Sequence, residues 1–387
     1  MVVGAGRDTS SAGGDAPSAG RETPGRGRAP AAIALTPILS ARYRSRDLER
    51  IRAAAPGARI VVVTSDGHPD GPLDEVEVLL RGAIPVEVFE RIVARAPRLR
   101  WVHSATAGVE RVLTPLSLER DLVITNARGV FSRPIAEYVM LMILAVSRRL
   151  PQLLELQRER TWQPLEGTEL RDVTVGIVGL GSIGRAVARL ASAFGCRVLA
   201  VRRRVDAGTE PAPRPAPGGE GVAIGAAGAR PEAAATGWEA GEPERLAVER
   251  VVGPSALLEL LGESDFIVLA APLTRETEAM IDAQALARVK PGAWLINVAR
   301  GRLVDERALL RALREGPLGG AVLDTFWEEP LPPTSPFYDL PNVIVTPHTS
   351  WASSRVLDRS IELFCENLRR FSRGEPLLNV VDPTVGY

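Results

Sequence analysis

Four residues in the second half of the chain carry side chains suited to anion binding and acid–base chemistry. Arg300, Asp324 and His348 each come just after a short apolar run, and Glu329 lies five residues beyond Asp324. In open α/β sheets, ligands bind beyond the carboxyl ends of the strands. If the apolar runs are strands of one parallel sheet, these side chains meet at one edge of it.

The chemistry that this set supports is the reduction of a 2-oxo acid. The planar guanidinium of Arg300 suits a carboxylate and the neighbouring carbonyl oxygen. An imidazole such as that of His348 can give up a proton near neutral pH. A carboxylate beside the histidine stabilises the imidazolium and orients the ring. Each residue alone is more often structural, and their succession along the chain is what favours a catalytic site.

A glycine-rich turn supplies a place for the hydride donor. An apolar run at 173–178 leads into Gly179-x-Gly181-x-x-Gly184 and then into a helix-forming stretch at 185–194. The first glycine allows a tight turn, the second lets the backbone approach a pyrophosphate, and the third lets the helix pack on the strand. The helix N-terminus then faces the phosphates, so we expect a dinucleotide site.

The next apolar run indicates which dinucleotide binds. Residues 197–201 are followed by Arg202, Arg203 and Arg204, at the place where an NAD site usually has an acidic residue. Arginines suit the 2′-phosphate of NADP. We therefore favour NADP, with Arg202 and Arg203 as contacts, and keep NAD as the alternative.

The elements needed to position these residues follow an α/β pattern in both halves of the chain. Strand-like runs lie at 32–36, 59–64 and 76–80, with amphipathic segments at 45–52 and 84–95 between them. A helix is expected to begin near Pro134. Near-continuous apolar strands are expected at 265–270, 293–298, 320–324 and 343–346. The apolar stripe of the last helix, at 357–371, should pack on the first domain.

Composition limits the alternatives. The chain has 387 residues, with 47 basic and 47 acidic side chains, so neither nucleic acid nor a membrane is expected as a partner. No apolar run reaches the ~20 residues of a membrane span, and no signal peptide is evident. Two cysteines suggest the cytoplasm and no metal site. We expect residues 1–30 to be a disordered tail and 205–245 a flexible insertion.

These motifs resemble the D-isomer-specific 2-hydroxyacid dehydrogenase family, and the glyoxylate/hydroxypyruvate reductases in particular. The resemblance rests on the glycine turn and on residues 289–305, 320–331 and 346–348. It implies that Arg300 binds the substrate carboxylate and carbonyl. It also implies that His348 is the acid/base, Glu329 its carboxylate partner, and Asp324 a contact of the nicotinamide.

The resemblance extends to the fold and to further site residues. It implies two Rossmann-like doubly wound domains, with a nucleotide-binding domain (150–349) inserted in a flavodoxin-like substrate domain (31–149 and 350–387). It implies a homodimer, to which residues 154–162 could lend an arm. Backbone amides of the first domain should hold the substrate carboxylate, and they belong to Ala107, Gly108 and Val109. The remaining cofactor contacts are expected at Ser182, Ile183, Pro272, Thr277 and Val298.

Two other functions remain open at this point. Formate and phosphite dehydrogenases share the architecture, but the formate type has a glutamine beside the histidine where this chain has Glu329. The C-terminal-binding-protein corepressors resemble the family and sense the cofactor without needing catalysis. Two side chains are also undecided. Arg81 could face the substrate cleft, and Trp351 could either line the pocket or wedge the domain interface.

Overall fold

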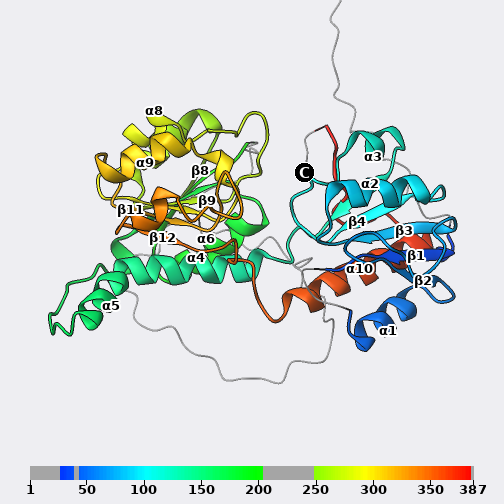
Figure 1. Cartoon of the computed structure of the whole chain (residues 1–387). Helices are drawn as coiled ribbons and strands as arrows, with labels where there is room; N and C mark the ends of the chain where they lie inside the picture. The colour runs from blue at the N-terminus through cyan, green and yellow to red at the C-terminus, as the bar shows by residue number, and fades with distance from the viewer. Residues whose placement is uncertain (1–26, 39–42, 204–247, 385–387) are drawn as a thin grey trace, which may run out of the picture.

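Two parallel β-sheets, each covered by helices, organise the chain in a computed structural model (Figure 1). The structure describes residues 27–38, 43–203 and 248–384. The expected insertion at 205–245 lies outside the described residues, as does most of the expected tail. The predicted α/β class with two parallel-sheet domains is confirmed.

The first sheet has five strands in the order β2-β1-β3-β4-β5, which is the flavodoxin-like order. Because successive side chains of a strand point to opposite faces, Ala32 and Ala34 enter one core while Ile33 and Leu35 enter the other. Helix α2 covers the first face, and α1 with α10 covers the second. The elements are β1 (Ala32–Leu35), α1 (Ser45–Ala54), β2 (Arg59–Val62), β3 (Val76–Arg81), α2 (Val86–Arg95), β4 (Trp101–Ser104), α3 (Pro115–Glu119), β5 (Val123–Asn126) and α10 (Val356–Arg373).

Helix α10 brings the C-terminal part of the chain back onto the first sheet. Trp101 of β4 packs against Phe364 and Phe371 of α10, with ring centroids 5.5 and 5.6 Å apart. Aromatic pairs of this kind add about 0.5–1.5 kcal/mol each beyond the area they bury.

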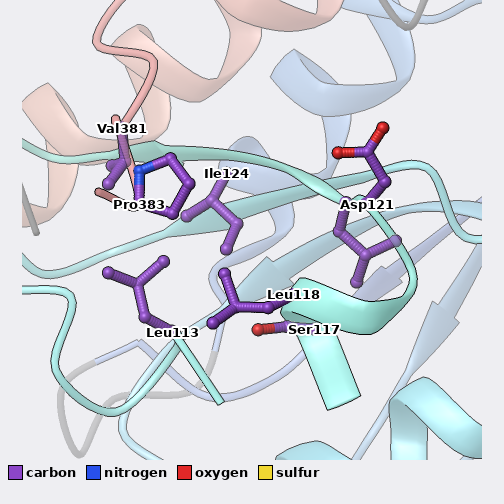
Figure 2. A pocket seen from close by; sticks show the side chains of 8 residues that line it. Leu113, Ser117, Leu118, Asp121, Ile124, Val381 and Pro383 are labelled. Carbon is purple, nitrogen blue, oxygen red and sulfur yellow. The ribbon is translucent and has the colours of Figure 1, made fainter. Parts of the chain in front are cut away.

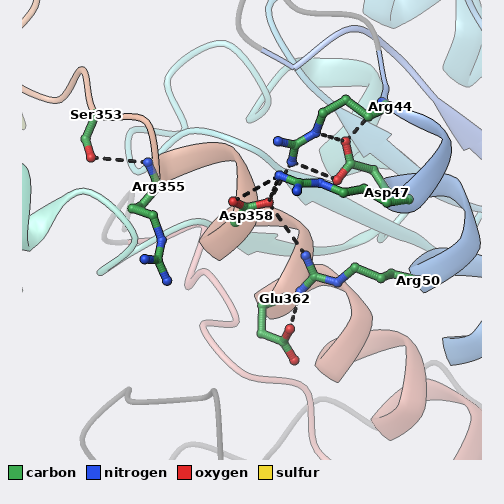
Figure 3. Close-up of polar contacts among 8 residues, drawn as sticks. Arg44, Asp47, Arg50, Ser353, Arg355, Asp358 and Glu362 are labelled. Carbon is green, nitrogen blue, oxygen red and sulfur yellow. Dashed lines mark hydrogen bonds and ion pairs between the residues drawn. The ribbon is translucent and has the colours of Figure 1, made fainter.

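Ion pairs join the outer side of α10 to the start of α1 (Figure 3). The guanidinium of Arg44 donates to Asp358 at 2.6 Å and to the buried Asp47 at 2.8 Å. Arg50 pairs with Glu362 one helical turn farther along α10. Burial acts to raise the pKa of Asp47, but the bonds from Arg44 outweigh it and leave this pKa below its ordinary value. The network fixes α10 on the first domain.

The second sheet has seven strands in the order β12-β11-β10-β9-β6-β7-β8. The strand order reverses between β6 and β9, which is where doubly wound sheets bind dinucleotides. Helices α4 and α6 cover one face, and α7, α8 and α9 cover the other. The strands are β6 (Thr174–Val178), β7 (Arg197–Val201), β8 (Arg250–Val252), β9 (Phe266–Leu269), β10 (Trp294–Asn297), β11 (Gly320–Leu323) and β12 (Val343–Val345). The helices are α4 (Ser132–Ser147), α5 (Leu150–Arg158), α6 (Ser182–Ala193), α7 (Leu257–Glu263), α8 (Ala283–Ala287) and α9 (Glu306–Arg314).

Helix α4 packs beside α6 on the second sheet (Figure 1). Its buried residues Ile135, Val139 and Ile143 share a core with Val187 of α6. The sequence places the first domain boundary after α4, at residue 149. On this packing we propose that the chain passes to the nucleotide-binding domain before α4, in the segment between β5 and Ser132.

A buried histidine in the first domain predicts how stability depends on pH. His103 of β4 is fully buried, its Nδ1 lies 2.7 Å from the Thr125 hydroxyl, and its Nε2 has no hydrogen-bond partner among the described residues. Burial lowers its pKa from 6.5 to about 3. Between these values the unfolded chain binds a proton that the folded chain rejects, so stability falls as the pH drops below 6.5.

Replacing His103 by asparagine should remove this pH dependence. One proton of difference corresponds to about 1.4 kcal/mol per pH unit, or about 2 kcal/mol between pH 6.5 and 5. Urea unfolding of both proteins at pH 7.5 and 5.0, followed by circular dichroism, measures the contribution. An equal loss of unfolding free energy in the two proteins would contradict the assignment.

Candidate active site

The predicted glycine turn joins β6 to α6 beside the loop that follows β9. Gly179 has a φ of +103°, and a Cβ there would lie 2.5 Å from the backbone nitrogen of Ala271. A Cβ on Gly184 would lie 2.1 Å from the carbonyl oxygen of Gly179. A Cβ on Gly181 would meet no atom within 4 Å. Two glycines are therefore required by packing, and the third faces open space at the N-terminus of α6.

The other residues predicted to bind the cofactor also follow strands of the second sheet. Ser182 and Ile183 form the half-exposed first turn of α6. Arg202 and Arg203 follow β7, and Pro272 and Thr277 follow β9, where the Thr277 hydroxyl donates to the Pro272 carbonyl at 2.7 Å. Val298 follows β10 and is buried. The carboxyl ends of β6, β7, β9 and β10 thus share one edge, and these residues fit a dinucleotide laid along it.

His348 and Glu329 form a hydrogen-bonded pair at the same edge. His348 Nδ1 lies 2.8 Å from Glu329 Oε2, and Glu329 Oε1 accepts the backbone N–H of Phe326 at 3.0 Å. Because an ionised carboxylate can only accept, Nδ1 carries the proton and Nε2 faces away from the pair. The side chain of His348 is 40% exposed. The arrangement leaves Nε2 for a proton transfer.

The charge of Glu329 is stabilised by its neighbours. Partial burial acts to raise its pKa, but the hydrogen bonds from His348 and Phe326 outweigh burial and leave the pKa below its ordinary value. The positive charges of His348 and Arg300 add to this lowering. Glu329 is therefore an anion at neutral pH, and the guanidinium of Arg300 lies near enough to act on it.

Asp324 follows β11 and lies against the segment that carries His348. It is fully buried and accepts three hydrogen bonds, from the Thr346 hydroxyl at 2.6 Å and from the N–H groups of Thr349 and Ser350 at 2.8 and 3.0 Å. The Tyr138 hydroxyl lies 2.7 Å from that of Thr346. The nicotinamide contact expected for Asp324 stays a prediction, whereas its visible role is to hold the loop around His348. The sequence analysis did not anticipate this network.

The backbone at His348 is itself unusual. Its φ is +49°, in the left-handed region that non-glycine residues seldom adopt. The bonds of Asp324 to the residues on both sides enforce this conformation. Strained backbone held in this way often serves to aim a functional side chain.

Arg300 connects the second domain to the first. Its carbonyl oxygen accepts from the Asn297 amide at 2.9 Å, and its Nη1 donates to the Ala299 carbonyl at 2.8 Å. Its Nε donates to Glu110 Oε1 at 3.2 Å. A Cβ on Gly108 would lie only 2.0 Å from Arg300 Nη2. The structure therefore brings Arg300 against the loop at 104–110.

That loop is suited to binding an anion. The N–H groups of Ala107, Gly108 and Val109 have no hydrogen-bond acceptor in the part of the chain that the structure describes. Its shape is fixed by other bonds, since the Thr106 hydroxyl donates to the Gly108 carbonyl and the Asn126 amide donates to the Ala107 carbonyl. Successive N–H groups of a turn that lack a protein acceptor can bind an anion together.

The structure shows the contacts of the two undecided side chains, Arg81 and Trp351. Arg81 is 3% exposed, donates to the Ile84 carbonyl at 2.9 Å and lies over the ring of Phe89. Burial lowers its pKa to about 10, with a smaller contribution from the charge of Arg111. Trp351 packs edge-on against Phe131, at the start of α4. Trp351 thus joins the segment that leads to α10 to the start of α4.

A small pocket in the first domain does not belong to this site (Figure 2). It contains none of the predicted site residues. It is lined by Leu113, Ser117, Leu118, Asp121, Leu122, Ile124, Val381 and Pro383.

None of the helices within the described ranges is long and apolar enough to cross a membrane.

Comparison with known proteins identifies the family. The family described as D-isomer specific 2-hydroxyacid dehydrogenase, NAD binding domain, matches residues 140–215 and 221–350. A glyoxylate reductase from Korarchaeum cryptofilum is 35% identical over 321 residues, which cover 81% of this chain and 83% of that protein. A D-3-phosphoglycerate dehydrogenase from Mycobacterium tuberculosis is 33% identical over 83% of this chain and 55% of its own length.

Solved structures agree. A D-isomer specific 2-hydroxyacid dehydrogenase from Xanthobacter autotrophicus, in complex with NADPH and MES, has a TM-score of 0.73 and 31% identity over 93% of this chain and 100% of that one. An NADPH-dependent glyoxylate/hydroxypyruvate reductase from Sinorhizobium meliloti, in complex with NADP and sulfate, has a TM-score of 0.70 and 28% identity over 92% and 99%. The family predicted from the motifs is confirmed. The chain belongs to the D-isomer specific 2-hydroxyacid dehydrogenase family and is an NAD(P)-dependent oxidoreductase.

Proposed function

We propose that this enzyme reduces a short 2-oxo acid to a D-2-hydroxy acid, with His348 as the proton donor. The observation that carries the proposal is the hydrogen bond of His348 to Glu329, on the sheet edge where Arg300 meets the loop of the first domain. The relatives that are glyoxylate and hydroxypyruvate reductases support this reading. They do not favour a corepressor or a formate-type enzyme.

Each site residue has a separate role in the proposed reaction. The amides of 107–109 and the guanidinium of Arg300 hold the substrate carboxylate, and Arg300 also polarises the 2-oxo group. A bound reduced nicotinamide supplies the hydride. The Nε2 proton of protonated His348 passes to the carbonyl oxygen, and the charge of Glu329 stabilises the imidazolium beforehand and orients the ring. His348 then regains a proton from solvent.

The substrate class is tested directly by NADPH oxidation. Glyoxylate and hydroxypyruvate are the first trials, followed by larger 2-oxo acids. Turnover of at least one 2-oxo acid, with a D-2-hydroxy acid as product, supports the proposal. Absence of turnover across the panel by a protein that binds the cofactor would favour a cofactor-sensing protein instead.

NADP is the proposed cofactor, because Arg202 and Arg203 stand where an acidic residue would contact the adenosine ribose. The pKa of Glu276, in the loop after β9, is lowered chiefly by a hydrogen bond from Thr274, and the charges of Arg203 and Arg275 contribute. Arg203 is thus near the loop that carries Pro272 and Thr277. NADP and NADPH are present in two of the similar solved structures.

Replacing both Arg202 and Arg203 by glutamine should weaken NADPH selectively. A charge-assisted hydrogen bond contributes about 1.5–3 kcal/mol, so KM for NADPH should rise on the order of 10–100-fold. KM for NADH should change by less than about threefold, because NADH lacks the phosphate. Arg314→Gln, which removes an exposed arginine of α9, is the matched control. Wild-type enzyme that uses NADH as well as NADPH would contradict the assignment.

We also propose a cytoplasmic homodimer. Both cysteines, Cys196 and Cys365, are free and buried, as expected in a reducing compartment. Leu150, Leu153 and Leu154 of α5 and the nearby Trp162 expose apolar surface, and Trp162 is fully exposed. Surface of this kind marks an interface. The mass in solution, measured by light scattering, tests the dimer.

A further inference from the structure

The guanidinium of Arg300 binds a carboxylate of the protein itself, that of Glu110. Glu110 comes directly after the loop of the proposed substrate amides, and its Oε1 accepts from Arg300 Nε at 3.2 Å. A Cβ on Gly108 would lie 2.0 Å from Arg300 Nη2 and 2.5 Å from Glu110 Oε2. The carboxylate of Glu110 and the guanidinium therefore meet over Gly108, within the segment assigned to the substrate carboxylate.

The contact joins the two domains. Glu110 belongs to the segment between β4 and α3, whereas Arg300 follows β10 of the other sheet. The side chains are 47% and 35% exposed. Water and salt screen such a pair, so it is weaker than a buried one. Glu110 can thus hold Arg300 in place and still release it at little cost.

The charges around Arg300 give this contact a consequence for specificity. Arg300 contacts Glu110, and its positive charge also contributes to the lowered pKa of Glu329. A substrate carboxylate that arrives at Arg300 must displace one anion and approach a second. A substrate with two negative charges meets more repulsion than one with a single charge.

We propose that Glu110 is a specificity-determining residue. In the free enzyme its carboxylate binds Arg300 where the substrate carboxylate would bind. A monoanionic 2-oxo acid displaces it, whereas a dianionic 2-oxo acid is repelled. This proposal rests on the proposed function of Arg300. It places the charge of Glu110 next to the position of the substrate carboxylate on Arg300, and Glu110 takes no part in proton transfer.

The test compares ligands of equal size that differ by one charge. Oxamate carries one negative charge and oxalate carries two, and both should compete with glyoxylate. In Glu110→Gln, KM for glyoxylate should fall about two- to fivefold, the range of an exposed ion pair. The ratio of the oxalate to the oxamate inhibition constant should fall on the order of tenfold, because the second charge is no longer repelled.

Two further variants separate charge from position. Glu110→Asp keeps the charge but is one methylene shorter, so it should retain most of the discrimination between oxalate and oxamate while losing the contact with Arg300. Glu75→Gln removes an exposed carboxylate that pairs with Arg59 in the first domain, and it should behave as wild type. A merely structural role of Glu110 would change both inhibition constants by the same factor.

The outcomes distinguish this inference from the proposed function. Wild-type turnover of glyoxylate, with an unchanged or raised KM and an unchanged inhibitor ratio in Glu110→Gln, would overturn the role of Glu110 alone. Wild-type protein without turnover of any 2-oxo acid would overturn the proposed function. A lowered KM together with a lowered ratio supports both.

Discussion

Replacement of His348 by asparagine should lower kcat by about 10²–10⁴-fold, the usual contribution of a positioned acid–base group. Nε2 is the only ring nitrogen left after Nδ1 bonds to Glu329, and the amide of asparagine cannot supply its proton. Asparagine suits the test because it tolerates the left-handed backbone found at this position. Single-turnover reduction of glyoxylate measures the effect.

The variant should still bind NADPH, because His348 lies outside the glycine turn and the arginines after β7. Fluorescence titration with NADPH therefore serves as its control. Retention of more than about a tenth of the wild-type kcat would contradict the assignment of His348 as the proton donor.

Much of the fold was predictable because six strands of the second sheet are short apolar runs. The strands β6, β7, β9, β10, β11 and β12 lie where the pattern put them. Strands β4 and β5 were not predicted from the sequence, because polar residues fill several of their buried positions. His103, Ser104, Thr125 and Asn126 are each no more than 3% exposed. Burial of paired polar groups within a strand leaves no apolar signature in the sequence.

The candidate site was likewise predictable only in part. Residues at strand ends could be expected at one edge, because parallel strands share a direction. The pairing of His348 with Glu329 followed from the family resemblance, and the distance of 2.8 Å agrees with it. The bonds of Asp324 to Thr346, Thr349 and Ser350, and the contact of Glu110 with Arg300, depend on how two segments fold toward each other. No periodicity or spacing encodes such contacts.

Replacement of Arg300 by alanine should lower kcat/KM for glyoxylate on the order of 10³-fold. Arg300 is proposed to bind two groups, and charge-assisted hydrogen bonds contribute about 1.5–3 kcal/mol each. The bond to the carboxylate exists in the ground state, so its loss raises KM. The bond to the carbonyl oxygen strengthens as negative charge develops, so its loss lowers kcat. Steady-state kinetics should therefore show both changes.

A lysine at the same position separates charge from geometry. Arg300→Lys keeps the cation but lacks the planar fork that reaches the carboxylate and the carbonyl oxygen together, so it should recover only part of the loss. Arg302→Ala removes a neighbouring arginine that pairs with Glu278 and lies over Trp327, and it should leave kcat/KM within about threefold of wild type, as surface ion pairs contribute little. If Arg300→Ala stayed within that same range, substrate binding would have to depend on the amides of 107–109 alone.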